Sequence, residues 1–160
     1  EPKCAHITLD SSGAEGNSVD DMVDQLAHLF EKPKAVLLPG RWQPLHVGHE
    51  WLIQRELDMG HRVVVGIRDT PVSDSDPFST DVRKRMIEHR YADEDVEAWV
   101  MPDIAAISYG RKVGYEVREA DDIPPEVFAV SATGVRGGNR ANVSERVMEF
   151  MIAEGIWDGE

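Results

Sequence analysis

Two histidines three residues apart, His46 and His49, are the residues of this sequence best suited to chemistry. They lie in residues 35–49, AVLLPGRWQPLHVGH, where an apolar run is followed by a polar turn and then a helical pattern. Around the first turn of a helix, side chains three apart project from one face toward the same point. Gly48 removes a side chain where a bulky ligand would approach. The spacing therefore predicts a ligand site at a strand-to-helix junction, and a phosphate would suit it.

Two other roles are open to the histidine pair. The spacing His-x-x-His also occurs in zinc sites, but these need further ligands. No third ligand stands at helical spacing, and Cys4, the only cysteine, is remote. A purely structural role is the other alternative. Contact with phosphate fits the pair better than either, so we predict no protein-bound metal there.

A second group of candidate residues follows an apolar segment near the end of the chain. Ser131 and Thr133 precede a short helical pattern that contains Arg136. The free N–H groups at a helix N-terminus favour an anion, and hydroxyls add donors to the same phosphate. The planar guanidinium one turn later could reach further phosphates. Ordinary N-capping is the alternative for the two hydroxyls, and a solvated surface arginine is the alternative for Arg136.

Three segments together resemble a known family. Residues 40–49, GRWQPLHVGH, resemble the nucleotide-binding signature of the cytidylyltransferase-like nucleotidyltransferases, most closely the archaeal-type nicotinamide mononucleotide adenylyltransferases. Residues 131–136, SATGVR, resemble that family's second motif. Residues 77–87, PFSTDVRKRMI, are similar to its middle segment, with Val82 where a glutamate is usual. A lone His-x-Gly-His is a weak signal, but three motifs in the expected order from about Lys34 onward are specific.

The resemblance implies an enzyme that transfers a nucleoside monophosphate from a nucleoside triphosphate to a phosphorylated small-molecule acceptor and releases pyrophosphate. AMP transfer is favoured over CMP transfer because the first and middle motifs are most similar to the adenylyltransferases. Catalysis would fall to His46, His49 and Arg136 as donors to phosphate oxygens. The triphosphate implies Mg²⁺, held mainly by substrate oxygens and water. The resemblance gives nucleotide binding to Gly40, Arg41, Gly48, Arg83, Ser131 and Thr133.

Arg83 has an open alternative, and one further residue is a candidate. Arg83 could contact the triphosphate or anchor its helix to a carboxylate. Asp69, just past the second apolar run, is a candidate for metal or ribose contact. The acceptor side is less well defined: Tyr109, Arg111 and Lys112 lie where relatives hold the second substrate, and a surface turn is their alternative. Because this segment is shorter than in the nicotinamide-nucleotide relatives, that particular acceptor stays open.

The elements that would position these residues follow from the apolar pattern. Strands are predicted at residues 35–39, 62–67, 96–101 and 127–130, and helices after His46, at 81–89 and after a cap at Asn142. Alternating strands and helices predict right-handed crossovers and an α/β fold: a Rossmann-like, doubly wound parallel sheet with helices on both faces. The ligand would lie beyond the carboxyl ends of the strands.

The first 33 residues have a different character. Residues 5–10 fit a short strand, and residues 19–30 carry apolar side chains at helical spacing. This segment resembles the C-terminal tail of adenylylsulfate kinases, but the kinase phosphate-binding loop is absent from the chain. We expect an appendage of residues 1–33 and a nucleotidyltransferase domain of residues 34–160. The rival interpretation is a non-catalytic nucleotide-binding or regulatory module associated with a sulfur-assimilation kinase.

Composition limits the partners. With 160 residues the chain fits one domain and an appendage. A formal net charge of -13 argues against a nucleic-acid or anionic-membrane surface. No apolar run approaches the roughly 20 residues that cross a bilayer. A single cysteine allows no internal disulfide, which fits a reducing cytoplasm, and homo-oligomer formation stays open.

Overall fold

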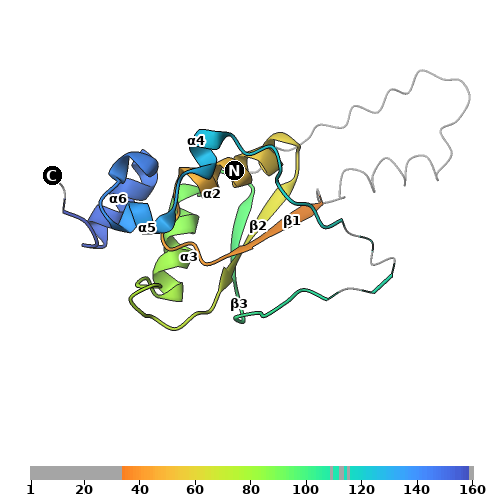
Figure 1. The fold of residues 1–160 in the computed structure, drawn as a ribbon, viewed down its shortest axis with the longest axis horizontal. Coiled ribbons are helices and arrows are strands. Elements are labelled where there is room, and N and C mark those ends of the chain that lie inside the picture. The colour runs from red at the N-terminus through yellow and green to blue at the C-terminus, as the bar shows by residue number, and fades with distance from the viewer. Residues whose placement is uncertain (1–33, 109, 112–113, 115, 159–160) are drawn as a thin grey trace, which may run out of the picture. The chain divides into compact units, whose positions relative to one another are not determined.

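A parallel sheet of three strands is the centre of the fold. The computed structural model describes residues 34–108, 110–111, 114 and 116–158, so the predicted appendage lies outside it. The strands are β1 (Ala35–Gly40), β2 (Arg62–Arg68) and β3 (Val96–Met101), side by side in that order (Figure 1). The register aligns Leu38 with Val65 and Val65 with Ala98. All three carboxyl ends therefore meet at one edge of the sheet.

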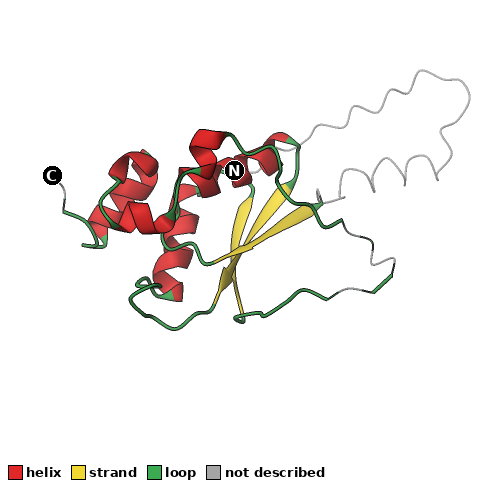
Figure 2. Cartoon of the chain, viewed as in Figure 1, coloured by secondary structure: helices red, strands yellow, loops and turns green. Residues whose placement is uncertain are grey.

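Helices connect and follow the strands (Figure 2). The first two are α2 (Val47–Asp58), between β1 and β2, and α3 (Thr80–Arg90), between β2 and β3. After β3 come α4 (Pro125–Phe128), α5 (Ala132–Arg136), a 3-10 helix (Arg140–Asn142) and α6 (Glu145–Ala153). Within the described part of the chain, no helix combines the length and apolar character needed to cross a membrane.

The helix ends follow local capping. Ser79 caps α3, because its hydroxyl accepts a hydrogen bond from the backbone N–H of Val82 at 3.3 Å, so the helix begins one residue before the predicted start. The cap predicted for the last helix at Asn142 is wrong. Asn142 belongs to the 3-10 helix, and Ser144, in extended conformation, is the N-cap of α6.

The core lies on one face of the sheet. Alternate strand residues pack in a single cluster with α2, α3 and α6; its strand and helix members include Val63, Val65, Ile67, Ala98, Ile53, Met86, Ile87 and Val147. On the other face, Leu37 is 47% exposed and Trp99 is 55% exposed. The parallel, Rossmann-like α/β fold is confirmed. In the described residues α2 and α3 cover only one face, since right-handed crossovers between strands in sequential order place both helices on the same side.

The strand predicted for residues 127–130 is wrong, and the reason is local. Pro125 occupies the first position of α4, where its fixed φ suits a helix and its missing N–H costs nothing. The backbone N–H groups of Phe128 and Ala129 then donate to the carbonyls of Pro124 and Pro125 at 2.9 and 3.1 Å. Ser131 therefore follows one turn of helix and not a strand, so the described sheet has no strand beyond β1 to reverse its order.

Candidate active site

The two histidines meet at the N-terminus of α2. His46 is the N-cap residue and its side chain makes no capping hydrogen bond. Its carbonyl accepts the N–H groups of His49 and Glu50 at 2.8 and 3.0 Å, which starts the helix. The two imidazole rings stack, with centroids 3.7 Å apart and planes 19° from parallel. The sequence spacing thus brings both rings to one place, beside the free N–H groups of the first helical turn.

Both rings are neutral at neutral pH. His46 is buried, and this burial lowers its pKa from the ordinary 6.5 to about 4. Enclosure of the half-buried His49, and then the charge of His46, lower the pKa of His49 to about 3, against an opposing hydrogen bond to the Pro44 carbonyl. The Nδ1 atoms of both rings are buried and have no hydrogen-bond partner among the described residues. An unpaired buried polar atom costs about 1–3 kcal/mol, so the packing of these two rings carries a cost in stability.

The lowered pKa values predict how stability depends on pH. As the pH falls, these two histidines take up protons in the unfolded chain before they do so in the folded protein, because both folded-state pKa values lie below 6.5. This contribution to the free energy of unfolding is therefore complete above about pH 6.5 and is lost as the pH falls toward about 4 for His46 and about 3 for His49. We expect the unliganded wild type to lose more stability between pH 7 and pH 5 than a His46→Gln/His49→Gln variant, as measured by urea unfolding. Equal losses in the two proteins would contradict these protonation states.

The missing side chain of Gly48 leaves room for the imidazole ring of His46. A Cβ built at Gly48 would lie 3.1 Å from both Cε1 and Nδ1 of His46 and 3.4 Å from the Val127 carbonyl oxygen. The space beside Gly48 is therefore occupied by the ring of His46 and by the backbone of α4, and the part of Gly48 in nucleotide binding stays a prediction. This close approach holds the first turn of α2 against α4.

We expect Gly48→Ala to displace the His46 ring and to lower kcat about tenfold, because small misplacements at a reacting centre are costly. Alanine favours a helix over glycine by about 1 kcal/mol, so stability should fall much less than activity. Gly110→Ala is the matched control, since a Cβ there meets nothing within 4 Å. Steady-state kinetics and thermal unfolding of both variants separate the two effects; an unchanged kcat in Gly48→Ala would refute this role.

The loop between β1 and α2 is held by hydrogen bonds from the side chains of Trp42 and Gln43. The Trp42 indole N–H donates to the Gly66 carbonyl at 3.1 Å, and a Cβ at Gly40 would lie 2.9 Å from that indole. Gln43 is buried, and its side chain bonds both backbone groups of Phe78, donating to the carbonyl at 2.8 Å and accepting from the N–H at 2.9 Å. The only sequence signal for Gln43 was its place inside the first motif.

Arg41 is the exposed cation of this loop. Its side chain is 56% exposed and Nη1 lies 3.4 Å from the buried Asp76 carboxylate, a loose ion pair. Asp76 also accepts from the Ser75 hydroxyl at 3.3 Å. Sequence reasoning missed Asp76, because nothing in a polar loop distinguishes one aspartate from its neighbours. A guanidinium in this setting is available to an incoming phosphate.

Arg83 differs from both of its expected roles. It is fully buried, and its donors go to protein oxygens: the carbonyls of Arg41, Arg68 and Ser79 and the hydroxyl of Thr80. A side chain enclosed in this way does not reach a bound triphosphate, so the assignment of Arg83 to nucleotide binding is corrected. The alternative, in which Arg83 anchors its helix, agrees better with the structure, although the partners are carbonyl oxygens and not the expected carboxylate.

The second motif touches the first. Arg136, half-buried at the end of α5, donates from Nη1 to the Gln43 carbonyl and from Nη2 to the Thr133 hydroxyl at 3.3 Å. Ser131 is the N-cap of α5, and its hydroxyl accepts the Gly134 N–H at 3.1 Å. Ser131 and Thr133 are both exposed. The structure therefore joins Arg136 to the loop that leads into the histidines, and it uses Ser131 as an ordinary cap.

The residues predicted to bind the acceptor are only partly described, and the structure shows the surroundings of Asp69, the metal or ribose candidate. Tyr109 and Lys112 lie outside the described residues, and Arg111 is exposed in a turn. Asp69, at the end of β2, accepts the Thr80 hydroxyl at 2.7 Å. No group of three or more potential metal ligands occurs in the part of the chain that is described, so the zinc alternative for the histidines finds no further ligand there.

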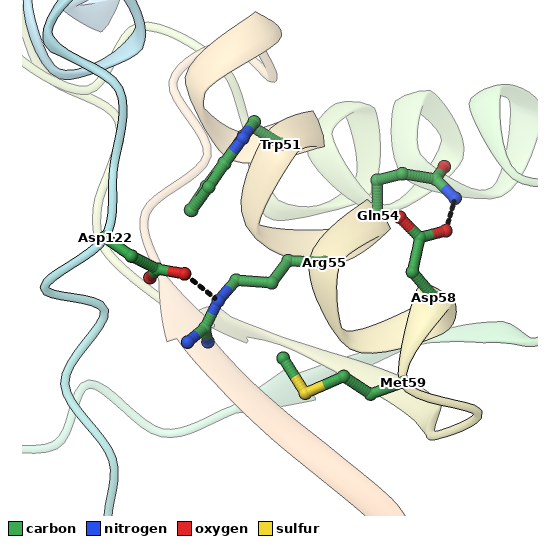
Figure 3. Close-up of a pocket in the computed structure, with 6 residues that line it drawn as sticks. All are labelled: Trp51, Gln54, Arg55, Asp58, Met59 and Asp122. Atoms are coloured by element: carbon green, nitrogen blue, oxygen red, sulfur yellow. Dashed lines mark hydrogen bonds and ion pairs between the residues drawn. The ribbon is translucent and has the colours of Figure 1, made fainter.

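A cavity of about 360 Å³ lies along α2 (Figure 3). In Figure 3, Trp51, Arg55 and Met59 line it from one side of the helix, and Asp122 faces them from the loop before α4. The Arg55 guanidinium is neutralised by Asp122 at 3.2 Å and by Glu56 at 3.1 Å. None of the residues predicted to act in catalysis lines this cavity, and we assign it no role.

Comparison with known proteins agrees with the motifs. The sequence matches the cytidylyltransferase-like family over residues 37–137, a span that holds all three motifs. A phosphopantetheine adenylyltransferase from Methanopyrus kandleri is 28% identical over 106 residues, covering 61% of this chain and 65% of that protein. The crystal structure of a bifunctional NMN adenylyltransferase/ADP-ribose pyrophosphatase from Francisella tularensis, complexed with AMP and a manganese ion, is 28% identical, with a TM-score of 0.36 over 44% of this chain and 22% of that one. The family match covers most of the sequence, and the chain belongs to the cytidylyltransferase-like family.

Proposed function

We propose that this protein is a nucleotidyltransferase, which transfers a nucleoside monophosphate to a phosphorylated small molecule and releases pyrophosphate. The observation that carries the proposal is the histidine pair at the N-terminus of α2. The two stacked rings have buried Nδ1 atoms without a partner, and α2 has no side-chain cap. A helix N-terminus that carries two adjacent imidazole rings is suited to the oxygens of a phosphate group.

The chemistry follows from where charge develops. A phosphate oxygen of the acceptor attacks the α-phosphorus, a new P–O bond forms, and the bond to the α–β bridging oxygen breaks. Its electron pair leaves with pyrophosphate. Each neutral imidazole has one N–H to donate, and His46 and His49 would direct these to the α-phosphate and bridging oxygens. The bound anion in turn favours the protonated rings, so triphosphate binding should raise both pKa values.

The other residues of the site would hold the triphosphate. Arg136 is proposed to bind the β- and γ-phosphates, since its guanidinium lies beside both motifs. Ser131 and Thr133 would add their hydroxyls, and Arg41 would exchange its loose pairing with Asp76 for a phosphate. The described residues offer no three-ligand metal site, so Mg²⁺ would arrive with the nucleotide, bound by its phosphates and water. We propose no catalytic step through the metal.

ATP is the favoured donor, and the acceptor is proposed only by class. The Methanopyrus kandleri relative is a phosphopantetheine adenylyltransferase, and phosphopantetheine is a phosphate monoester. We therefore propose AMP transfer to a phosphate monoester in the cytoplasm, by a catalytic domain of residues 34–160.

Pyrophosphate release tests the proposal directly. ATP and CTP would each be incubated with Mg²⁺ and one acceptor: phosphopantetheine, nicotinamide mononucleotide, glycerol 3-phosphate or sulfate. We expect release that depends on one nucleotide and one phosphate monoester. Release with sulfate alone would contradict the acceptor class. Triphosphate binding without release from any pair would favour the non-catalytic nucleotide-binding module.

A further inference from the structure

Arg83 is the largest fully buried side chain of the described residues, and it sits under the candidate site. Its Nη1 donates to two carbonyl oxygens, that of Arg41 at 2.8 Å and that of Arg68 at 2.9 Å. Nε donates to the Ser79 carbonyl at 3.3 Å and Nη2 to the Thr80 hydroxyl at 2.9 Å. One guanidinium thus reaches four oxygens.

These partners come from the places where the site is built. Arg41 directly follows β1, Arg68 is the last residue of β2, and Ser79 and Thr80 begin α3. The Thr80 hydroxyl in turn donates to Asp69 at 2.7 Å. The guanidinium therefore ties the carboxyl ends of two neighbouring strands to a helix start, at the edge of the sheet where a ligand binds in such folds.

Burying this charge needs a reason beyond packing. A buried cation is costly unless its donors are satisfied, and here carbonyl oxygens satisfy them. Asp69 and Asp76 are near enough for their negative charges to oppose the lowering of the Arg83 pKa by burial. A leucine of similar bulk would cover the core without this cost, but it could not fix the Arg41 carbonyl. Lysine, a single point donor, could not span four oxygens either.

We infer that Arg83 is a positioning residue: by holding the Arg41 carbonyl to the end of β2, it fixes the backbone from which the exposed Arg41 side chain reaches the triphosphate. This inference rests on the proposed function. Arg83 would thus act through Arg41, because its own side chain is buried and its donors are bound to protein oxygens. Thr80 and Asp69 belong to the same hydrogen-bonded chain.

A double-mutant cycle tests it. The affinity for Mg·ATP would be measured calorimetrically for the wild type, Arg83→Lys, Arg41→Ala and the double variant of the full chain. We expect each single variant to weaken binding about tenfold, and the double variant to bind like Arg41→Ala, because Arg83 acts through Arg41. A role in stability alone would not give this loss of additivity. Thermal unfolding of each variant records the structural cost separately.

Two further variants complete the design. Arg90→Lys is the control: Arg90 is also partly buried on α3, but it pairs with Glu50 at 3.4 Å and Glu94 at 2.9 Å, so its loss should leave ATP affinity unchanged.

If Arg83→Lys does not fold, Thr80→Val removes the hydroxyl that accepts from Arg83, at similar volume. We expect this variant to weaken ATP binding less than Arg83→Lys, and to have no further effect in a protein that already carries Arg41→Ala. Arg83→Lys with wild-type affinity, or an equal further loss beside Arg41→Ala, would overturn the inference. No Mg·ATP binding by the wild type would instead overturn the proposed function.

Discussion

Replacing His49 with alanine is expected to lower kcat for pyrophosphate release about 100- to 1,000-fold. The ring lies at the N-terminus of α2, stacked on His46, and would donate to an oxygen whose charge grows in the transition state. Removal of one such preorganised donor costs about 3–4 kcal/mol in other enzymes. KM for the nucleoside triphosphate should change much less, because the interaction is strongest in the transition state.

His89→Ala is the matched control for this substitution. His89 is exposed on α3, with its ring 5.8 Å from that of Phe150, and it lies outside all three motifs. We expect its kcat to equal that of the wild type. A His49→Ala enzyme that turns over as fast as His89→Ala would remove the histidines from the mechanism.

Loss of Arg136 is expected to act on binding. We expect Arg136→Ala to raise KM for the triphosphate about 10- to 100-fold, since a hydrogen bond to a charged group contributes about 1.5–3 kcal/mol. The guanidinium stands between the Gln43 carbonyl and the Thr133 hydroxyl, so part of the loss would come from a less ordered loop. Initial rates over a range of ATP concentrations, with acceptor saturating, measure this effect.

Arg140→Ala separates phosphate binding from loss of a nearby charge. Arg140 donates to the Asp158 carbonyl at 3.0 Å and lies 5.4 Å from the centre of the Trp157 ring. We expect a KM for ATP close to that of the wild type. If both arginine variants raised KM equally, the effect would reflect net charge and Arg136 would have no specific role.

The parts of the fold that the sequence predicted well have strong local patterns. The apolar run in β2 is continuous because the strand is central, and β3 was predicted with its observed ends. His46 and His49 converge as predicted, although His46 is the extended N-cap of α2 and only His49 lies in its first helical turn. The family resemblance of the three motifs agrees with the match over residues 37–137.

The predictions that were wrong concern features that depend on contacts distant in sequence or on a competing local signal. Residues 127–130, Val-Phe-Ala-Val, have strand propensity, but Pro125 starts a helical turn before them. The burial of Arg83 depends on the carbonyls of Arg41 and Arg68, which only the folded chain brings near. A positively charged residue beside a phosphate motif suggests a ligand contact, and only its burial shows that the protein itself takes up its donors.

The bond that is cleaved in the nucleotide is the most direct test of the proposed activity. Phosphorus-31 NMR would follow the wild-type protein with Mg·ATP and phosphopantetheine, with His49→Ala measured in parallel. We predict inorganic pyrophosphate and a new adenylyl product, joined to the acceptor phosphate by a phosphoanhydride bond, in equal amounts, formed at a much lower rate by His49→Ala. Orthophosphate and ADP, formed at the same rate by both proteins, would show cleavage at the γ-phosphate and contradict nucleotidyl transfer by this site.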